Sequence, residues 1–178
     1  MAVFGLSLMP ALMLPAARAL AADTAAPMTL VSPAFAPGSP IPAQFTCSGA
    51  DTSPALNWTN APKGTSSFAL IVEDPDAPSG TFVHWVLFNL PGDKTELTAG
   101  LPKTRLLDGG GAQGTNSFGS VGYRGPCPPP GPPHHYHFIL FALDSSLGAD
   151  SSYDASALRS AMSGHIKATT ELVGTFGR

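Results

Sequence analysis

The sequence has 178 residues, of which 43% are hydrophobic and 12% charged, and it contains 19 glycines and 19 prolines. A glycine inside a helix costs about 1 kcal/mol and a proline about 3 kcal/mol, so this composition excludes a mainly helical protein and predicts a turn-rich, mainly β domain. The formal charge of −3, without a clustered basic face, argues against a nucleic-acid partner.

The N-terminal segment is predicted to be a signal peptide. Residues 2–17 are apolar but too short and too interrupted by proline to span a bilayer, and residues 19–21 (ALA) match a secretory cleavage site. The segment lacks the usual basic start, because Arg18 is its first charged residue. We expect export to the periplasm or outside the cell with loss of residues 1–21, leaving one domain over residues 22–178 without a transmembrane span. A buried N-terminal segment or a lipid-facing anchor is the alternative.

Two cysteines, Cys47 and Cys127, remain in the mature domain. In an oxidising compartment an isolated pair is expected to be bridged, and this bridge would close a loop of about 80 residues, worth about 4 kcal/mol. Without export, the alternative is two reduced and separately buried thiols.

Short strands and polar turns are expected in the first half of the domain. Four prolines divide residues 28–45, which is typical of an edge strand and turns. The loop 47–58 (CSGADTSPALNW) is rich in hydroxyl groups, and we favour a turn that satisfies its own backbone over a ligand site. Residues 67–72 (SFALIV) form an apolar run, which predicts a strand buried on both faces.

Three acidic residues follow this buried strand directly, within residues 73–76 (EDPD). Carboxylates so close in sequence repel one another unless donors or a cation lie nearby. Asp74 and Asp76 could cap the turn around the intervening prolines, line a ligand site, or do both.

The next strand is predicted over residues 82–90, where apolar positions alternate. This alternation places His84 on one face with Val86 and Phe88, so the residue could be a hydrogen-bonded core histidine. An upstream carboxylate beside the imidazole would instead raise the pKa of His84 and give it a proton to donate to an anion.

Residues 91–120 are polar and rich in glycine, which predicts a long surface excursion without periodic structure. The GK followed by Ser or Thr of a phosphate-binding P-loop is missing from this stretch.

Six prolines within residues 126–133 make the next loop stiff, and a strand with three histidines follows it. Alternation places His134 and Tyr136 on one face and His135 and His137 on the other. A zinc site made by all three histidines would require the strand to break, so we predict no metal site; a metal held by His135 and His137 is the alternative.

The C-terminal region changes to a helical period. Asp154 is a good N-cap, and apolar residues recur every three to four positions from Leu158 to Val173. We expect an amphipathic helix, interrupted or kinked near Gly164, that covers the sheet, and a last short strand in residues 174–178 (GTFGR).

Three of these stretches resemble the phosphatidylethanolamine-binding protein family, in its bacterial Raf-kinase-inhibitor-like branch. They are EDPDAPSGTFVHWVLFNLP, NSFGSVGYRGPCPPPGPPHHYHFILFALD and AMSGHIKATTELVGTFGR, and the resemblance runs from about residue 32 to residue 178. It implies a single mainly β domain, with a large antiparallel Greek-key sheet packed on a smaller sheet, and helices near the C-terminus. It also implies a small anion pocket at one end of the large sheet.

The resemblance assigns pocket residues by motif position. These are Asp74, Asp76, His84, His134 and Tyr136, with Cys127, Pro128 and Pro129 as the wall. The resemblance implies a non-enzymatic binding or inhibitor-type protein that holds phosphate, a phosphoryl head group or a carboxylate. It implies no cofactor, and a kinase or protease as a further partner. The oligomeric state is left open between monomer and homodimer. A hydrolase with an Asp and His dyad is the alternative, although no nucleophile motif is present.

Overall fold

The computed structural model describes Met1, residues 26–148 and residues 152–178. The expected signal peptide and its cleavage site therefore lie outside the described residues, apart from Met1. Within the described part of the protein, no helix is long and apolar enough to cross a membrane.

Two antiparallel sheets form the domain. The larger sheet has the strand order β6-β4-β3-β7-β8, and the smaller has the order β1-β2-β5. The strands are β1 (Thr29–Val31), β2 (Leu56–Thr59), β3 (Ser67–Asp74), β4 (Phe82–Pro91), β5 (Glu96–Leu97), β6 (Ala112–Gln113), β7 (His134–Leu143) and β8 (Ile166–Phe176), with a 3-10 turn (Ala43–Phe45) and one helix, α1 (Ala155–Met162). The predicted fold class, a mainly β domain with a large sheet packed on a smaller one, is confirmed.

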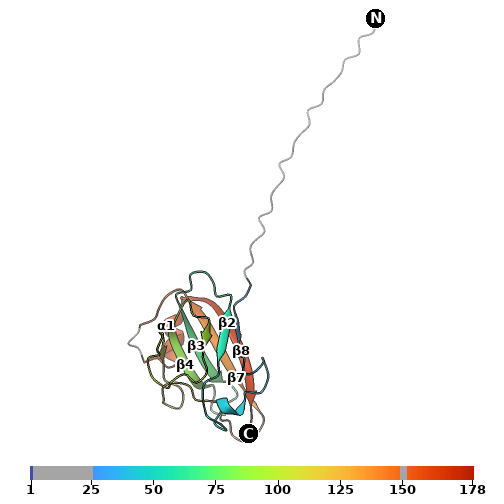
Figure 1. Cartoon of the computed structure of the whole chain (residues 1–178), viewed down its shortest axis with the longest axis vertical. Coiled ribbons are helices and arrows are strands. Elements are labelled where there is room, and N and C mark those ends of the chain that lie inside the picture. The colour runs from blue at the N-terminus through green and yellow to red at the C-terminus, as the bar shows by residue number, and fades with distance from the viewer. Residues whose placement is uncertain (2–25, 149–151) are drawn as a thin grey trace.

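Apolar side chains cover both faces of the large sheet. The inner cluster fills the space between the two sheets and includes Leu56 and Trp58 of β2. The outer cluster lies under α1, which contributes Leu158 and Met162. In Figure 1, β3, β4, β7 and β8 run side by side, and α1 lies near β4. The central strand β3 is therefore buried on both faces, as its apolar run predicts.

Strand β7 follows the predicted alternation. Tyr136 and Phe138 belong to the inner cluster, whereas Ile139 and Phe141 belong to the outer one. The two faces of β7 thus separate the histidines: His134 lies on the inner side with Tyr136, and the other two lie outside.

The predicted C-terminal helix is wrong beyond its first eight residues. Asp154 does cap α1, because its carboxylate accepts a hydrogen bond from the backbone N–H of Ala157 at 2.8 Å. The helix ends at Met162, and Gly164 turns the backbone with a φ of 83°. Residues 166–176 then form β8, which pairs with β7 along its whole length. The backbone hydrogen bonds to β7 override a sequence pattern that suits a helix as well as a strand.

The long excursion predicted over residues 91–120 is more ordered than expected. It contains β5 and β6, and its Gln113 is fully buried. The Gln113 side-chain oxygen accepts a hydrogen bond from the indole N–H of Trp85 at 2.7 Å. A polar side chain in this stretch therefore satisfies a buried tryptophan of the large sheet.

Candidate functional site

A cavity of about 250 Å³ opens at the end of the large sheet where β3 ends and β4 and β7 begin. Because β3 is antiparallel to both neighbours, its last residues meet the first residues of β4 and β7. The C-terminus of the protein lies at this same end of the molecule (Figure 1). The lining residues are Asp74, Ala77, Pro78, Ser79, Phe82, His84, Phe118, Cys127, Pro128, Pro129, His134 and Tyr136.

Asp74 and His134 form a short buried pair in this cavity. The Asp74 carboxylate accepts a hydrogen bond from Nδ1 of His134 at 2.7 Å and another from the backbone N–H of Asp76 at 2.9 Å. The second bond is the turn cap that the DPD sequence suggests, so turn and cavity wall coincide. The Asp74 side chain is 4% exposed and that of His134 13%. The carboxylate therefore orients the imidazole, with Nδ1 bound and Nε2 left for the cavity.

A β-bulge places His84 in the cavity. Val72 pairs with Trp85 but Glu73 pairs with Val83, so β4 carries one extra residue, His84, at this point. The ring of His84 lies with its centroid 5.2 Å from that of Tyr136, on the inner side of the sheet.

The set of side chains predicted to share a face with His84 is therefore partly wrong. Val86 and Phe88 belong to the outer cluster under α1. Phe82 does line the cavity with His84, and Leu90 belongs to the inner cluster. The bulge interrupts the alternation from which the face was deduced, so Phe82 lies on the opposite face from Val86 and Phe88.

Hydrogen bonds to a neighbouring segment fix the His84 ring. Its Nδ1 donates to the backbone carbonyl of Arg124 at 2.7 Å, and the backbone N–H of Arg124 donates to the carbonyl of His84 at 3.1 Å. Burial lowers the pKa of His84, and this effect exceeds the raising effects of the Arg124 carbonyl and of Asp74. The expectation of a raised pKa is thus wrong, and the free imidazole is neutral at pH 7.

Tyr136 brings a buried hydroxyl group to the same wall. The residue is fully buried, and its hydroxyl makes no hydrogen bond of ordinary distance and angle among the described residues. Burial, then the charge of the Asp74 carboxylate and a weaker hydrogen-bond contact with it, raise the pKa of the phenol, which therefore keeps its proton. A buried O–H group without a partner costs about 1–3 kcal/mol, unless a ligand or water pairs with it.

Asp76 lies at the rim and is not among the lining residues. Its carboxylate accepts hydrogen bonds from the backbone N–H of His135 at 2.8 Å and from the His135 ring at 2.7 Å. The ring hydrogen bond is the largest cause of the lowered pKa of Asp76. The structure therefore gives the two acids different surroundings: Asp74 faces the cavity and Asp76 faces solvent.

The proline-rich loop forms one wall, and a disulfide holds it. Cys127 is bonded to Cys47 with a Cα–Cα distance of 5.4 Å, and the backbone N–H of Cys47 donates to the Pro126 carbonyl at 3.1 Å. The Nε of Arg178 donates to the Pro128 carbonyl at 2.7 Å, which ties the C-terminus to the same wall. The loop is fixed at several points without belonging to a sheet.

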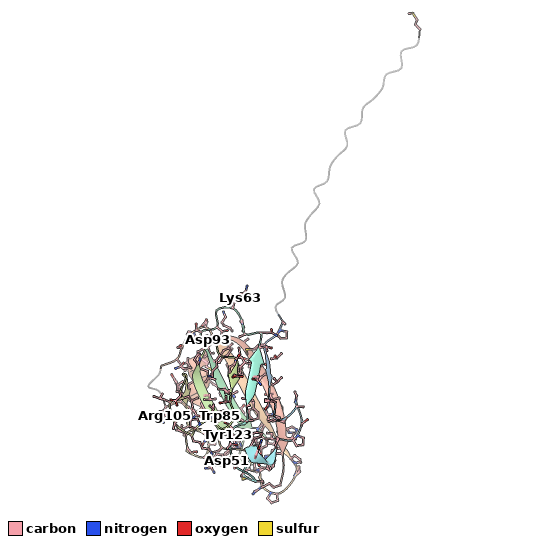
Figure 2. The ribbon with its side chains drawn as sticks, in the orientation of Figure 1. Asp51, Lys63, Trp85, Asp93, Arg105 and Tyr123 are labelled. Atoms are coloured by element: carbon pink, nitrogen blue, oxygen red, sulfur yellow. A yellow bond between two sulfur atoms is a disulfide. The ribbon has the colours of Figure 1, made fainter. Side chains whose placement is uncertain are left out.

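Asp51 is a further residue of the site that the sequence did not assign. Its carboxylate accepts a hydrogen bond from the backbone N–H of Gly125 at 2.6 Å and pairs with Lys103 at 2.9 Å. Asp51 thus holds the segment whose Arg124 carbonyl binds His84. Figure 2 shows Asp51 beside Tyr123, at the opposite end of the sheet from Lys63 and Asp93. The loop 47–58, predicted to satisfy only its own backbone, therefore also holds the segment that binds His84 in the cavity wall.

Phe118 is the second residue that the sequence did not assign. Its ring makes edge contacts with Phe82 and His84, with centroids 4.8 and 5.6 Å apart, and the Arg124 guanidinium lies over it at 4.8 Å. The sequence predicts only a surface excursion over residues 91–120, and nothing in it shows where this aromatic ring lies. The ring makes the cavity mouth apolar.

The remaining histidines lie away from the cavity. His137 pairs with Glu171 at 2.7 Å and His165 with Asp144 at 2.9 Å. Across residues 26–148 and 152–178, no group of three or more His, Cys, Asp or Glu side chains could hold a metal ion.

Comparison with known proteins assigns the family. The family model described as phosphatidylethanolamine-binding protein matches residues 31–177. The chain belongs to the phosphatidylethanolamine-binding protein family. In this family member, the matched range contains both sheets almost entirely and every residue that lines the cavity.

Two relatives and two solved structures show how far the similarity to other family members extends. A UPF0098 protein of Methanothermobacter thermautotrophicus is 42% identical over 151 residues, covering 85% of this chain and 99% of the relative. A Mycobacterium tuberculosis protein named as a candidate lipoprotein, LppC, is 42% identical over 161 residues, covering 87% and 75%.

Among solved structures, a phosphatidylethanolamine-binding protein homologue of Chlamydia trachomatis has a TM-score of 0.78 at 38% identity, covering 85% of this chain and 98% of that one. YbcL of Escherichia coli, described as a member of the mammalian family, has a TM-score of 0.79 at 33% identity, covering 86% and 99%. The similarity therefore extends over nearly the whole of both solved proteins.

Proposed function

We propose that this protein is a non-enzymatic binding protein that holds a small anion in the cavity at the end of the large sheet. The ligand class is phosphate, a phosphoryl head group or a carboxylate. The buried hydroxyl of Tyr136 supports this most directly: it has no well-formed hydrogen bond, although the Asp74 carboxylate lies near it, and an anion oxygen would supply a better-placed acceptor. The Nε2 atoms of His84 and His134 have no partner among the described residues either, so three polar groups line one small space.

The family relationship extends this proposal to an inhibitor-type role. In it, the cavity engages an anionic group of a kinase, a protease or another protein partner. We further propose that the protein acts in the periplasm or after secretion. The disulfide between Cys47 and Cys127 supports this location, because such bonds persist in oxidising compartments.

Replacing Tyr136 with Phe should weaken phosphate binding about tenfold, since it removes one hydrogen bond to a charged group and leaves the ring in place. The measurement is isothermal titration calorimetry with inorganic phosphate at pH 7. Tyr153→Phe is the matched control, because Tyr153 packs on Phe88 outside the cavity and should bind phosphate like the parent protein. Equal affinity in Tyr136→Phe and the parent would contradict the proposal.

Ester hydrolysis is the second candidate function, favoured by the Asp74–His134 pair. A carboxylate that fixes Nδ1 and leaves Nε2 free is the arrangement of a general base. The nucleophile is the weak part: Cys127 is in a disulfide, and Ser79 makes no hydrogen bond to a histidine in the described structure.

The binding proposal predicts no phosphate release from p-nitrophenyl phosphate above the rate without protein. Turnover by the parent protein that is lost in His84→Ala and kept in His137→Ala would show that the protein is a hydrolase and would contradict the binding proposal. His137 serves as the control because it pairs with Glu171 outside the cavity.

A further inference from the structure

The two cavity histidines already use the same ring nitrogen. Nδ1 of His84 faces the Arg124 carbonyl at 2.7 Å, and a carbonyl oxygen can only accept, so Nδ1 carries the proton. Nδ1 of His134 faces the Asp74 carboxylate at 2.7 Å and donates to it for the same reason. In the neutral ring of His84, Nε2 therefore carries a lone pair.

The cavity wall consequently offers an acceptor to the ligand at His84. Tyr136 contributes a donor, its phenolic O–H, and the Nε2 lone pair of His84 lies on the same wall. No lysine or arginine is among the lining residues, and the Asp74 carboxylate adds a negative charge behind the wall. An anion without a proton would meet the lone pair of His84 and a like charge, which is an unfavourable environment.

We propose that the cavity selects oxyanions that bring an acidic proton, namely inorganic phosphate and phosphate monoesters, over sulfate and phosphodiesters, which bring none. This inference rests on the proposed anion-binding function and narrows its ligand class. A P–O–H group donates to Nε2 of an imidazole, while another phosphate oxygen accepts from Tyr136. A phosphate monoester has a second pKa of about 6, close to that of a free imidazole. The phosphate oxygen and the imidazole Nε2 can therefore share one proton in a hydrogen bond.

Sulfate carries no proton at neutral pH, so the imidazole itself would have to be protonated in order to donate a hydrogen bond to it. Burial already lowers the pKa of His84, so protonating this ring to receive sulfate is costly at neutral pH. A site whose buried acceptors stay unpaired rejects the ligand that lacks the matching proton.

The selection distinguishes two sources of a phosphoryl group. The head group of an intact phospholipid is a phosphodiester, whereas free phosphate, phosphoethanolamine and a phosphorylated side chain carry ionisable P–O–H groups. The geometry of the wall favours the second group of ligands over the intact lipid.

Calorimetric titration of the full-length protein at pH 7.0 and constant ionic strength tests this selection with two ligand pairs. The first pair is inorganic phosphate and sulfate, and the second is phosphoethanolamine and glycerophosphoethanolamine. We expect the first member of each pair to bind at least about tenfold more tightly, because one unpaired buried acceptor has about this effect on affinity.

His84→Phe provides a change that misfolding would not mimic. The phenyl ring keeps the bulk of the imidazole but has no acceptor, so phosphate loses its partner at this position and the phosphate-to-sulfate ratio should fall to within about threefold. His137→Phe is the matched control, because it makes the same change outside the cavity, and should keep the parent ratio.

Each outcome separates the inference from the proposed function. Equal or tighter binding of sulfate and of the diester by the parent protein overturns the selection and leaves anion binding standing. Absence of binding for all four ligands overturns both. A parent ratio that His84→Phe leaves unchanged removes His84 from the selection and so contradicts its assigned role.

Discussion

Replacing both Cys47 and Cys127 with serine should lower the free energy of unfolding by about 4 kcal/mol. The bond joins residues 80 positions apart, so removing it frees a long loop in the unfolded state. Both cysteines are exposed, and serine therefore creates no buried cavity at either position. Urea unfolding at pH 7, followed by tryptophan fluorescence, gives the difference.

Chemical reduction of the parent protein is the control for this double substitution. Reduction should cause the same loss of stability, and reoxidation should restore it, because only the cross-link changes. A loss below about 1 kcal/mol in both experiments would show that backbone contacts such as the Cys47–Pro126 hydrogen bond hold the loop without the disulfide.

Asp74→Asn should lower the free energy of unfolding by about 2 kcal/mol. The Asp74 carboxylate accepts two hydrogen bonds in a buried site, from the His134 ring and from the backbone N–H of Asp76. Asparagine has one oxygen, so its N–H₂ group must face one of these donors, which is then left without an acceptor. The same urea measurement, at pH 7, gives the change in unfolding free energy.

Asp76→Asn is the matched control, two residues away in the same turn. One oxygen of Asp76 accepts both bonds from His135, and the pair is exposed, so asparagine can take over these contacts. Stability should change by less than about 0.5 kcal/mol. Equal losses in the two variants would contradict the different environments assigned to the two acids.

Several parts of the fold and the site follow from the sequence because they depend on local patterns. The apolar run of residues 67–72 predicts a strand buried on both faces, and β3 has this environment. The alternation in residues 134–141 separates His134 and Tyr136 from His135 and His137, as the two clusters show. Each of these strands stays regular over the residues that matter, so side-chain period alone determines the face.

The position of His84 shows where a local pattern is insufficient. A β-bulge adds one residue to β4 opposite β3, and nothing in the VHW sequence marks it. The bulge depends on the register of two strands that meet only in the folded protein. One extra residue moves a histidine from the outer face to the cavity.

Asp51 shows a different limit of the sequence. A hydroxyl-rich loop with an aspartate satisfies its own backbone in many proteins, and the local pattern favours that interpretation. In the folded protein, Asp51 binds the backbone of Gly125, 74 positions further on in the sequence. The sequence cannot show that pairing, although the two cysteines, if bridged, bring the same two segments together.

Phosphate is expected to bind between His84 and His134 through their Nε2 atoms. Long-range ¹H–¹⁵N spectra of the histidine side chains, recorded during a phosphate titration at pH 7, report on these two atoms separately. We predict that Nε2 of both residues shifts until the site is saturated, while Nδ1 stays protonated and the signals of His137 and His165 stay in place. Unchanged Nε2 signals at millimolar phosphate, or shifts confined to His137 and His165, would contradict it.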